Sequence, residues 1–280
     1  MTALLLLLLA QDALAAAGAA AMQAKNYPEA VHAYRALLVK EPANTNWRLQ
    51  LGLAHFYGNE HSEAASQLAD FIRRQPQPGA GHLFLGVSLL KLERPCDAIP
   101  PLEAALRWPQ RPRSRWIALA EAYQGCQRWE PAAQAYAEAA QADPKDLRIV
   151  RRGAHCWRLA RRYPAAKALF ATLEIHYASN AEFQFEYGDT LMRLDGAAAG
   201  LPWLEKAAAA DPALMPAQAA LGRALLELDR PAAAVPHLEA AAKTDPALLL
   251  ALSRAYRSVG RPLEATRAEA GYKKHFAKGY

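Results

Sequence analysis

The sequence repeats a pattern of small and large apolar residues every 34 positions. In blocks that begin at 11, 45, 79, 113, 147, 181 and 215, positions 8 and 20 are always Gly or Ala. Position 24 is large and apolar in every block: Tyr34, Leu68, Leu102, Tyr136, Phe170, Leu204 and Leu238. Positions 20, 24 and 27 follow the period of an α-helix, so they mark one buried helical face.

Helix-breaking residues divide these blocks into two helices. Turn residues lie near the middle, at Asn26-Tyr27-Pro28, Gly58-Asn59-Glu60, Asp195-Gly196 and Asp229-Arg230-Pro231. Prolines at 42, 76, 144, 212 and 246 end blocks, and a proline both stops a helix and suits the first turn of the next. Small residues at positions 8 and 20 let two backbones approach beside the large residue at position 24. The sequence therefore predicts an all-α protein of helix–turn–helix hairpins.

The composition agrees with this fold. Apolar residues make up 52% of the chain, and most of them are Ala and Leu, which are strong helix formers.

The pattern resembles the tetratricopeptide repeat family. The fourth block matches the family pattern at eight positions: Trp116, Leu119, Ala120, Tyr123, Ala132, Tyr136, Ala139 and Pro144. The resemblance covers residues 11–278 and implies a right-handed α-solenoid superhelix of about eight 34-residue repeats. The eighth repeat, over 247–278, is shortened. Its Glu269 replaces the large apolar residue, so we expect it to cap the array.

The resemblance also implies a function. In the family, the first helix of each repeat lines a concave groove that holds an extended peptide or a helix. The chain is therefore predicted to be a protein-interaction scaffold with a protein or peptide partner. The positions that would face this ligand are Leu49, Leu53, Phe56, Leu83, Val87, Arg148, Arg151, His155, Arg158, Phe185, Arg223 and Arg254. The apolar members form a stripe of the kind that marks interaction surfaces.

Arg148, Arg151 and Arg158 share one predicted helix face. Three guanidinium groups repel one another unless an anion lies between them, so they are candidates for binding carboxylate or phosphate. The alternative is that Glu182 and Asp189, on the first helix of the next repeat, neutralise them.

Basic residues are concentrated in one part of the chain. The net charge is +6, and residues 107–167 hold thirteen Lys/Arg against five Asp/Glu. This stretch suggests an alternative function in binding nucleic acid or another polyanion, with strong salt dependence. It is equally compatible with an ordinary solvated surface.

Catalytic motifs are absent from the sequence. It holds no phosphate-binding Gly-rich loop, H-E-x-x-H or G-x-S-x-G, and its eight His are scattered. We expect no enzyme activity, no cofactor, no metal and no small-molecule substrate.

The N-terminal segment 1–10 contains a run of eight apolar residues from Ala3 to Ala10. This run is too short to span a membrane but fits the apolar region of a bacterial signal peptide, with cleavage after Ala10 or Ala15. It predicts export to the periplasm. The alternative is an extension of the first helix in a cytoplasmic protein.

The three cysteines, Cys96, Cys126 and Cys156, show no zinc-binding spacing and are expected to be small core residues. Export would allow a Cys96–Cys126 disulfide, because both lie near the turn end of adjacent hairpins.

Overall fold

The computed structural model describes residues 2–77, 79–108 and 113–276, with side chains from Gln11 onward. The side chains of the predicted signal segment 1–10 therefore lie outside the described part. Residues 109–112 of the basic stretch and the last two residues of the predicted eighth repeat also lie outside it. Within the described ranges every regular element is a helix. None of the helices described is long and apolar enough to cross a membrane.

The chain folds into two compact units, Met1–Ile149 and Val150–Tyr280. The first unit contains α1 (Thr2–Gln23), α2 (Tyr27–Lys40), α3 (Thr45–Tyr57), α4 (His61–Arg74), α5 (Ala80–Lys91), α6 (Pro95–Ala105), α7 (Arg113–Gly125) and α8 (Trp129–Ala142). Helix α9 (Leu147–Leu159) spans the division. The second unit continues with α10 (Tyr163–Tyr177), α11 (Ala181–Asp195), α12 (Ala197–Ala210), α13 (Met215–Glu227), α14 (Pro231–Ala242), the 3₁₀ helix η1 (Pro246–Leu248), α15 (Leu249–Ser258) and α16 (Pro262–Phe276).

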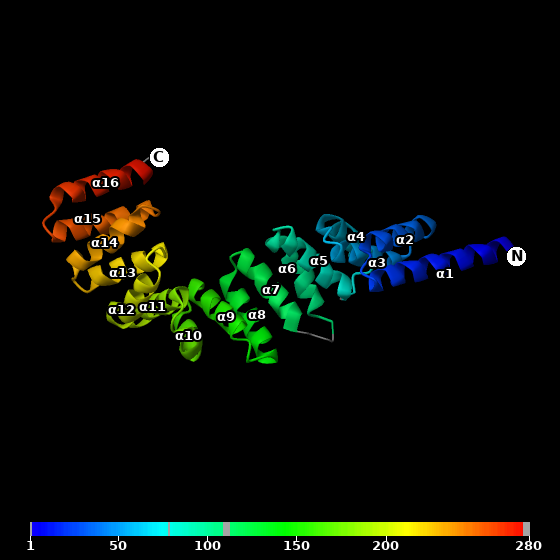
Figure 1. Ribbon diagram of the computed structural model, residues 1–280, viewed down its shortest axis with the longest axis horizontal. Coiled ribbons are helices and arrows are strands. Elements are labelled where there is room, and N and C mark those ends of the chain that lie inside the picture. The colour runs from blue at the N-terminus through cyan, green and yellow to red at the C-terminus, as the bar shows by residue number, and fades with distance from the viewer. Residues whose placement is uncertain (1, 78, 109–112, 277–280) are drawn as a thin grey trace. The chain divides into compact units, whose positions relative to one another are not determined.

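The helices form consecutive packed pairs, as in α1–α2, α3–α4, α11–α12 and α15–α16 (Figure 1). The all-α repeat architecture predicted from the sequence is confirmed.

Small residues bring the two helices of a pair together. A Cβ added to Gly52 would lie 2.8 Å from Cγ of Leu68, and one added to Gly222 would lie 2.6 Å from Cγ of Leu238. Both leucines are fully buried. Position 8 thus packs against position 24 of the same repeat, as the sequence predicts.

The turn inside each pair has one recurring geometry. Six non-glycine residues adopt a left-handed backbone conformation at position 15 of their repeats: Lys25, Asn59, Glu93, Gln127, Arg161 and Asp229. The backbone N–H of the next residue then donates to a carbonyl five residues back, as Arg94 N–H does to Leu89 O at 2.9 Å. This hydrogen bond ends the first helix in a Schellman motif. This motif is hard to recognise from the sequence, because these positions are not glycine.

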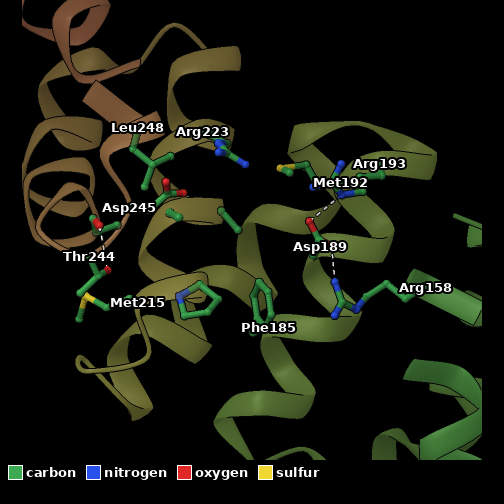
Figure 2. Close-up of a pocket in the computed structure, with 14 residues that line it drawn as sticks. Arg158, Phe185, Asp189, Met192, Arg193, Met215, Arg223, Thr244, Asp245 and Leu248 are labelled. Carbon is green, nitrogen blue, oxygen red and sulfur yellow. Dashed lines mark hydrogen bonds and ion pairs between the residues drawn. The ribbon is translucent and has the colours of Figure 1, made fainter. Parts of the chain in front are cut away.

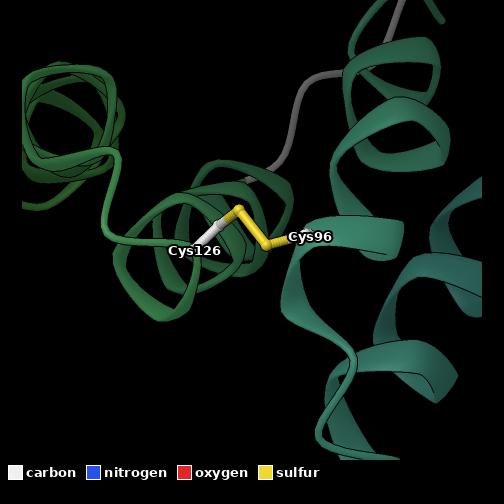
Figure 3. The surroundings of a disulfide bond; sticks show 2 residues. All are labelled: Cys96 and Cys126. Atoms are coloured by element: carbon white, nitrogen blue, oxygen red, sulfur yellow. A yellow bond between two sulfur atoms is a disulfide. The ribbon is translucent and has the colours of Figure 1, made fainter.

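Two of the three cysteines are not core residues. Cys96, at the start of α6, and Cys126, just after α7, form a disulfide with a Cα–Cα distance of 5.1 Å (Figure 3). The expectation that these two fill the core is therefore wrong. Cys156 is free and buried, and burial raises the pKa of its thiol to about 12.

Candidate functional site

The second unit contains a pocket of about 350 Å³. Its walls come from α11 and α13, which are the first helices of successive repeats, and from residues 241–248 at the end of α14 and in η1 (Figure 2). Arg158 of α9 also lines the pocket. The pocket thus lies on the helices that the sequence assigned to ligand binding.

Apolar side chains form much of the pocket lining. Phe185 and Met192 come from α11, and Met215 comes from the first turn of α13. Leu248 of η1 is almost fully buried, so it forms a fixed part of the wall. Methionine side chains adapt readily to different ligand shapes. The lining therefore suits an apolar side chain of a partner.

One wall of the pocket carries an ionic triad centred on a buried carboxylate. The Asp189 carboxylate, 5% exposed, accepts hydrogen bonds from Arg158 Nη1 at 3.0 Å and from Arg193 Nε at 2.8 Å. Burial is the strongest single influence on the pKa of Arg193 and acts to lower it, but the charge and hydrogen bond of Asp189, together with Tyr163, outweigh burial and the pKa is raised. The Arg158 guanidinium also lies 5.4 Å from the centre of the Phe185 ring. Both arginines are therefore held in place by contacts inside the protein.

Arg223 of α13 differs from these two arginines in its ion pairing and not in its exposure, because Arg193 is exposed as well. Its side chain is exposed, and in the described part of the chain no carboxylate lies within ion-pair distance of it. In Figure 2 it extends from α13 toward the side of the pocket that carries Met192. Asp245, the other carboxylate of the pocket, accepts a hydrogen bond from Ala247 N–H at 3.0 Å and caps η1.

A family model described as tetratricopeptide repeat matches residues 7–70 and again residues 49–115. The same period of 34 residues and the same turn geometry continue through the second unit. The chain is a tetratricopeptide repeat protein.

Solved structures of other tetratricopeptide repeat proteins share its fold. The C-terminal part of one from Cytophaga hutchinsonii has a TM-score of 0.59 at 13% identity, covering 81% of this chain and 94% of that chain. YrrB, described as having an unusual peptide-binding site, has a TM-score of 0.57 at 16% identity, covering 67% and 96%. PilF from Pseudomonas aeruginosa has a TM-score of 0.57 at 16% identity, covering 77% and 95%. No curated protein matches the sequence.

The predicted cationic face on this tetratricopeptide repeat array is neutralised. Arg151 pairs with Glu182 at 3.2 Å, and its Nε lies 3.7 Å from Glu186, whose carboxylate also contacts His155. Arg158 pairs with Asp189, as described above. For Arg151 and Arg158, these contacts agree with the interpretation in which acidic residues of the next repeat neutralise the arginines.

Arg148 lies in the first unit and has its own partner there. Its Nε donates to Asp146 at 3.0 Å, and Arg113 contacts the same carboxylate. These bonds, first from Arg148 and then from Arg113, hold the pKa of Asp146 well below its ordinary value. Arg148, Arg151 and Arg158 are therefore each paired with a carboxylate.

Another arginine of the basic stretch is buried. Arg115 donates to the carbonyl of Ala105 at 3.1 Å and lies 4.3 Å from the centre of the Trp108 ring. Its role is structural. This contact also gives Trp108 a place against a neighbouring helix rather than an open surface.

The apolar candidates of the first unit are only half-buried. Leu49, Leu53 and Phe56 lie on α3, and Leu83 and Val87 lie on α5. Leu83 and Val87 pack against a core cluster that includes Leu89, Leu102 and Leu119, so part of each contributes to the core. The Phe56 ring meets the Phe84 ring edge-on, with centroids 4.9 Å apart.

Of the predicted site residues, the pocket of the second unit brings together Arg158, Phe185 and Arg223. Arg254 is exposed on α15 and is not among the residues that line the pocket.

Among the pocket residues that the sequence did not indicate are Arg193, Met215, Asp245 and Leu248. Asp245 lies just before the shortened repeat and Leu248 lies at its start, and that shortening was the one signal that this region is unusual. Among the residues described, no group of three His, Cys, Asp or Glu could hold a metal ion.

Proposed function

We propose that the protein is a non-enzymatic adaptor that binds an extended or helical segment of a partner protein in the pocket of the second unit. The observation that carries this proposal is the position of the pocket, on the first helices of two successive repeats. Its mixture of apolar lining and a few fixed polar groups is typical of recognition sites. The described peptide-binding site of YrrB, which shares the fold, is consistent with it.

The polar groups of the pocket favour binding over catalysis. Its buried carboxylate, Asp189, is occupied by hydrogen bonds from two guanidinium groups, which hold it within the wall as part of the binding surface. The polyanion alternative draws less support from the structure, because Arg113, Arg148, Arg151 and Arg158 are paired with carboxylates.

The disulfide supports a second proposal, which concerns location. Disulfides form and persist in oxidising compartments. The Cys96–Cys126 bond and the apolar run at 3–10 both favour export. We propose that the protein matures outside the reducing cytoplasm.

Filling the pocket tests the binding proposal. Ala219 lines the pocket and is half-exposed, so Ala219→Leu would occupy ligand space while keeping a strong helix former. We expect recovery of the partner from the producing cells, measured by quantitative mass spectrometry after cross-linking, to fall about tenfold or more.

Ala209→Leu is the matched control. Ala209 is exposed on α12 and is not a pocket residue, so this variant should retain the partner. Equal recovery by both folded variants would show that the pocket is not the binding site.

A further inference from the structure

We propose that the pocket of the second unit recognises a carboxylate next to a large apolar side chain, with the carboxylate bound by Arg223. This inference rests on the proposed function and names the chemistry of the segment that the pocket binds. The apolar side chain enters the space bounded by Phe185, Met192, Met215 and Leu248 (Figure 2).

The repeat register explains why Arg223 is free of an internal partner. Between the fifth and sixth repeats, basic side chains pair with carboxylates 31 residues later: Arg151 with Glu182, His155 with Glu186 and Arg158 with Asp189. Arg223 occupies the same repeat position as His155. In the shortened eighth repeat the position of Glu186 is held by Ala251, which carries no charge. The cation of this pair is kept while its carboxylate is missing.

The other two cations of the pocket do not compete for the ligand. Arg158 and Arg193 both donate hydrogen bonds to Asp189, which is 5% exposed, so each guanidinium already has an internal acceptor and the three groups together keep only one net positive charge. An incoming anion gains most at the exposed guanidinium of Arg223, which can donate two parallel hydrogen bonds to one carboxylate.

The remaining charges favour a carboxylate over a phosphate. Asp189 and Asp245 both line the pocket, and each would repel a second negative charge on the ligand. A single guanidinium balances one negative charge and not two. The carboxylate can come from an Asp or Glu side chain or from the C-terminus of the partner, and both present the same group to Arg223.

The pocket is too small for a whole folded surface but fits one large side chain and its neighbours. Its volume of about 350 Å³ lies near the lower end of the range for ligand pockets. Met192 and Met215 can adjust to a leucine, methionine or phenylalanine side chain. Specificity for the apolar residue is therefore expected to be broad, and specificity for the charge is expected to be narrow.

The experiment is selection of peptides from a random library of about 12 residues on the full-length protein. Wild-type protein should enrich sequences in which Asp, Glu or the free C-terminus lies beside a large apolar residue. For a selected peptide, Arg223→Gln should weaken binding by about 10- to 100-fold, as for loss of a charged hydrogen bond. Replacing the acidic residue by its amide, or amidating the C-terminus, distinguishes the two carboxylate sources.

Charge exchange gives a stricter test. Arg223→Glu should reject the selected acidic peptide and bind the same peptide carrying Lys in place of its acidic residue. Arg267→Gln, a matched change at an exposed arginine of α16 outside the pocket lining, should leave binding unchanged.

The outcomes separate the two proposals. If selected peptides are lost by Ala219→Leu but show no acidic preference and no response to Arg223→Gln, the carboxylate inference is overturned and the adaptor function stands. If no peptide is selected, or if selected peptides bind Ala219→Leu normally, the proposed function fails and the inference fails with it.

Discussion

Single side chains decide how this repeat array responds to pH. His82 of α5 is 5% exposed, and in the described structure its Nδ1 is buried without a hydrogen-bond partner. Burial lowers the pKa of this imidazole below its ordinary value, because the charged form loses hydration. The neutral form is therefore the one that the folded first unit accommodates.

His82→Phe should reduce the loss of stability in mild acid. In wild type the unfolded chain takes up a proton near pH 6.5, whereas the folded chain takes it up only at lower pH. Stability therefore falls as the pH falls through that window. We expect the difference between urea midpoints at about pH 7.5 and about pH 5.5 to be smaller in His82→Phe than in wild type.

The exposed His32 of α2 supplies the control for this measurement. His32→Gln should keep the wild-type pH dependence of the midpoint. An unchanged pH dependence in His82→Phe would show that His82 does not link folding to proton uptake.

At the scale of an element, the turn between paired helices holds one residue in a slightly strained backbone conformation. Glu93, between α5 and α6, has a φ of 56°, a left-handed conformation that costs an L-residue about 1 kcal/mol relative to glycine. Its side chain is exposed, and its backbone N–H donates to Leu90 O at 3.1 Å. A glycine keeps that hydrogen bond and removes the strain.

Glu93→Gly should raise the free energy of unfolding by about 0.5–1 kcal/mol. The same substitution at Glu138, an exposed residue inside α8, should lower it by about 1 kcal/mol, because glycine is unfavourable within a helix. Urea denaturation of both variants gives each effect as a change in the free energy of unfolding, so the two can be compared directly. Destabilisation of similar size at both positions would contradict the left-handed conformation assigned to Glu93.

At the scale of the whole molecule, stability in a repeat array comes mainly from contacts between neighbouring repeats. The Cys96–Cys126 disulfide adds a covalent link between the third and fourth repeats of the first unit. It closes a loop with a sequence separation of 30 residues, which limits the freedom of the unfolded chain.

Reduction of the disulfide should lower the free energy of unfolding by about 3–4 kcal/mol. The double variant Cys96→Ser and Cys126→Ser should match the reduced wild type in urea denaturation, whether or not a reductant is present. No change on reduction would contradict a stabilising role for the bond.

Acid-quenched protein from the producing cells should expose one reactive thiol on denaturation, from Cys156, if the protein matures in an oxidising compartment. Three thiols would overturn that localisation.

The helix pairs and the starts of their first helices follow from the sequence alone. Helices begin at Thr45, Arg113, Leu147 and Met215, within a residue of block starts set by the 34-residue period. This is so because helix geometry is local: small residues at position 8 and large residues at position 24 can meet only in one arrangement of two adjacent helices. Phe185 and Arg223 were placed on the predicted ligand-facing side by their register together with the resemblance to the tetratricopeptide repeat family.

Tertiary structure decided which charges are free and which thiols are joined. Whether Arg158 meets Asp189, or Cys96 meets Cys126, depends on side-chain positions across helices that lie 30 or 31 residues apart in sequence. Composition and spacing are compatible with a row of arginines that have no partners and equally with a row that carboxylates neutralise. The pocket itself arises where η1 replaces the usual linker, because the shortened repeat changes which side chains border α13. Such contacts follow from packing in three dimensions, which no period along the chain encodes.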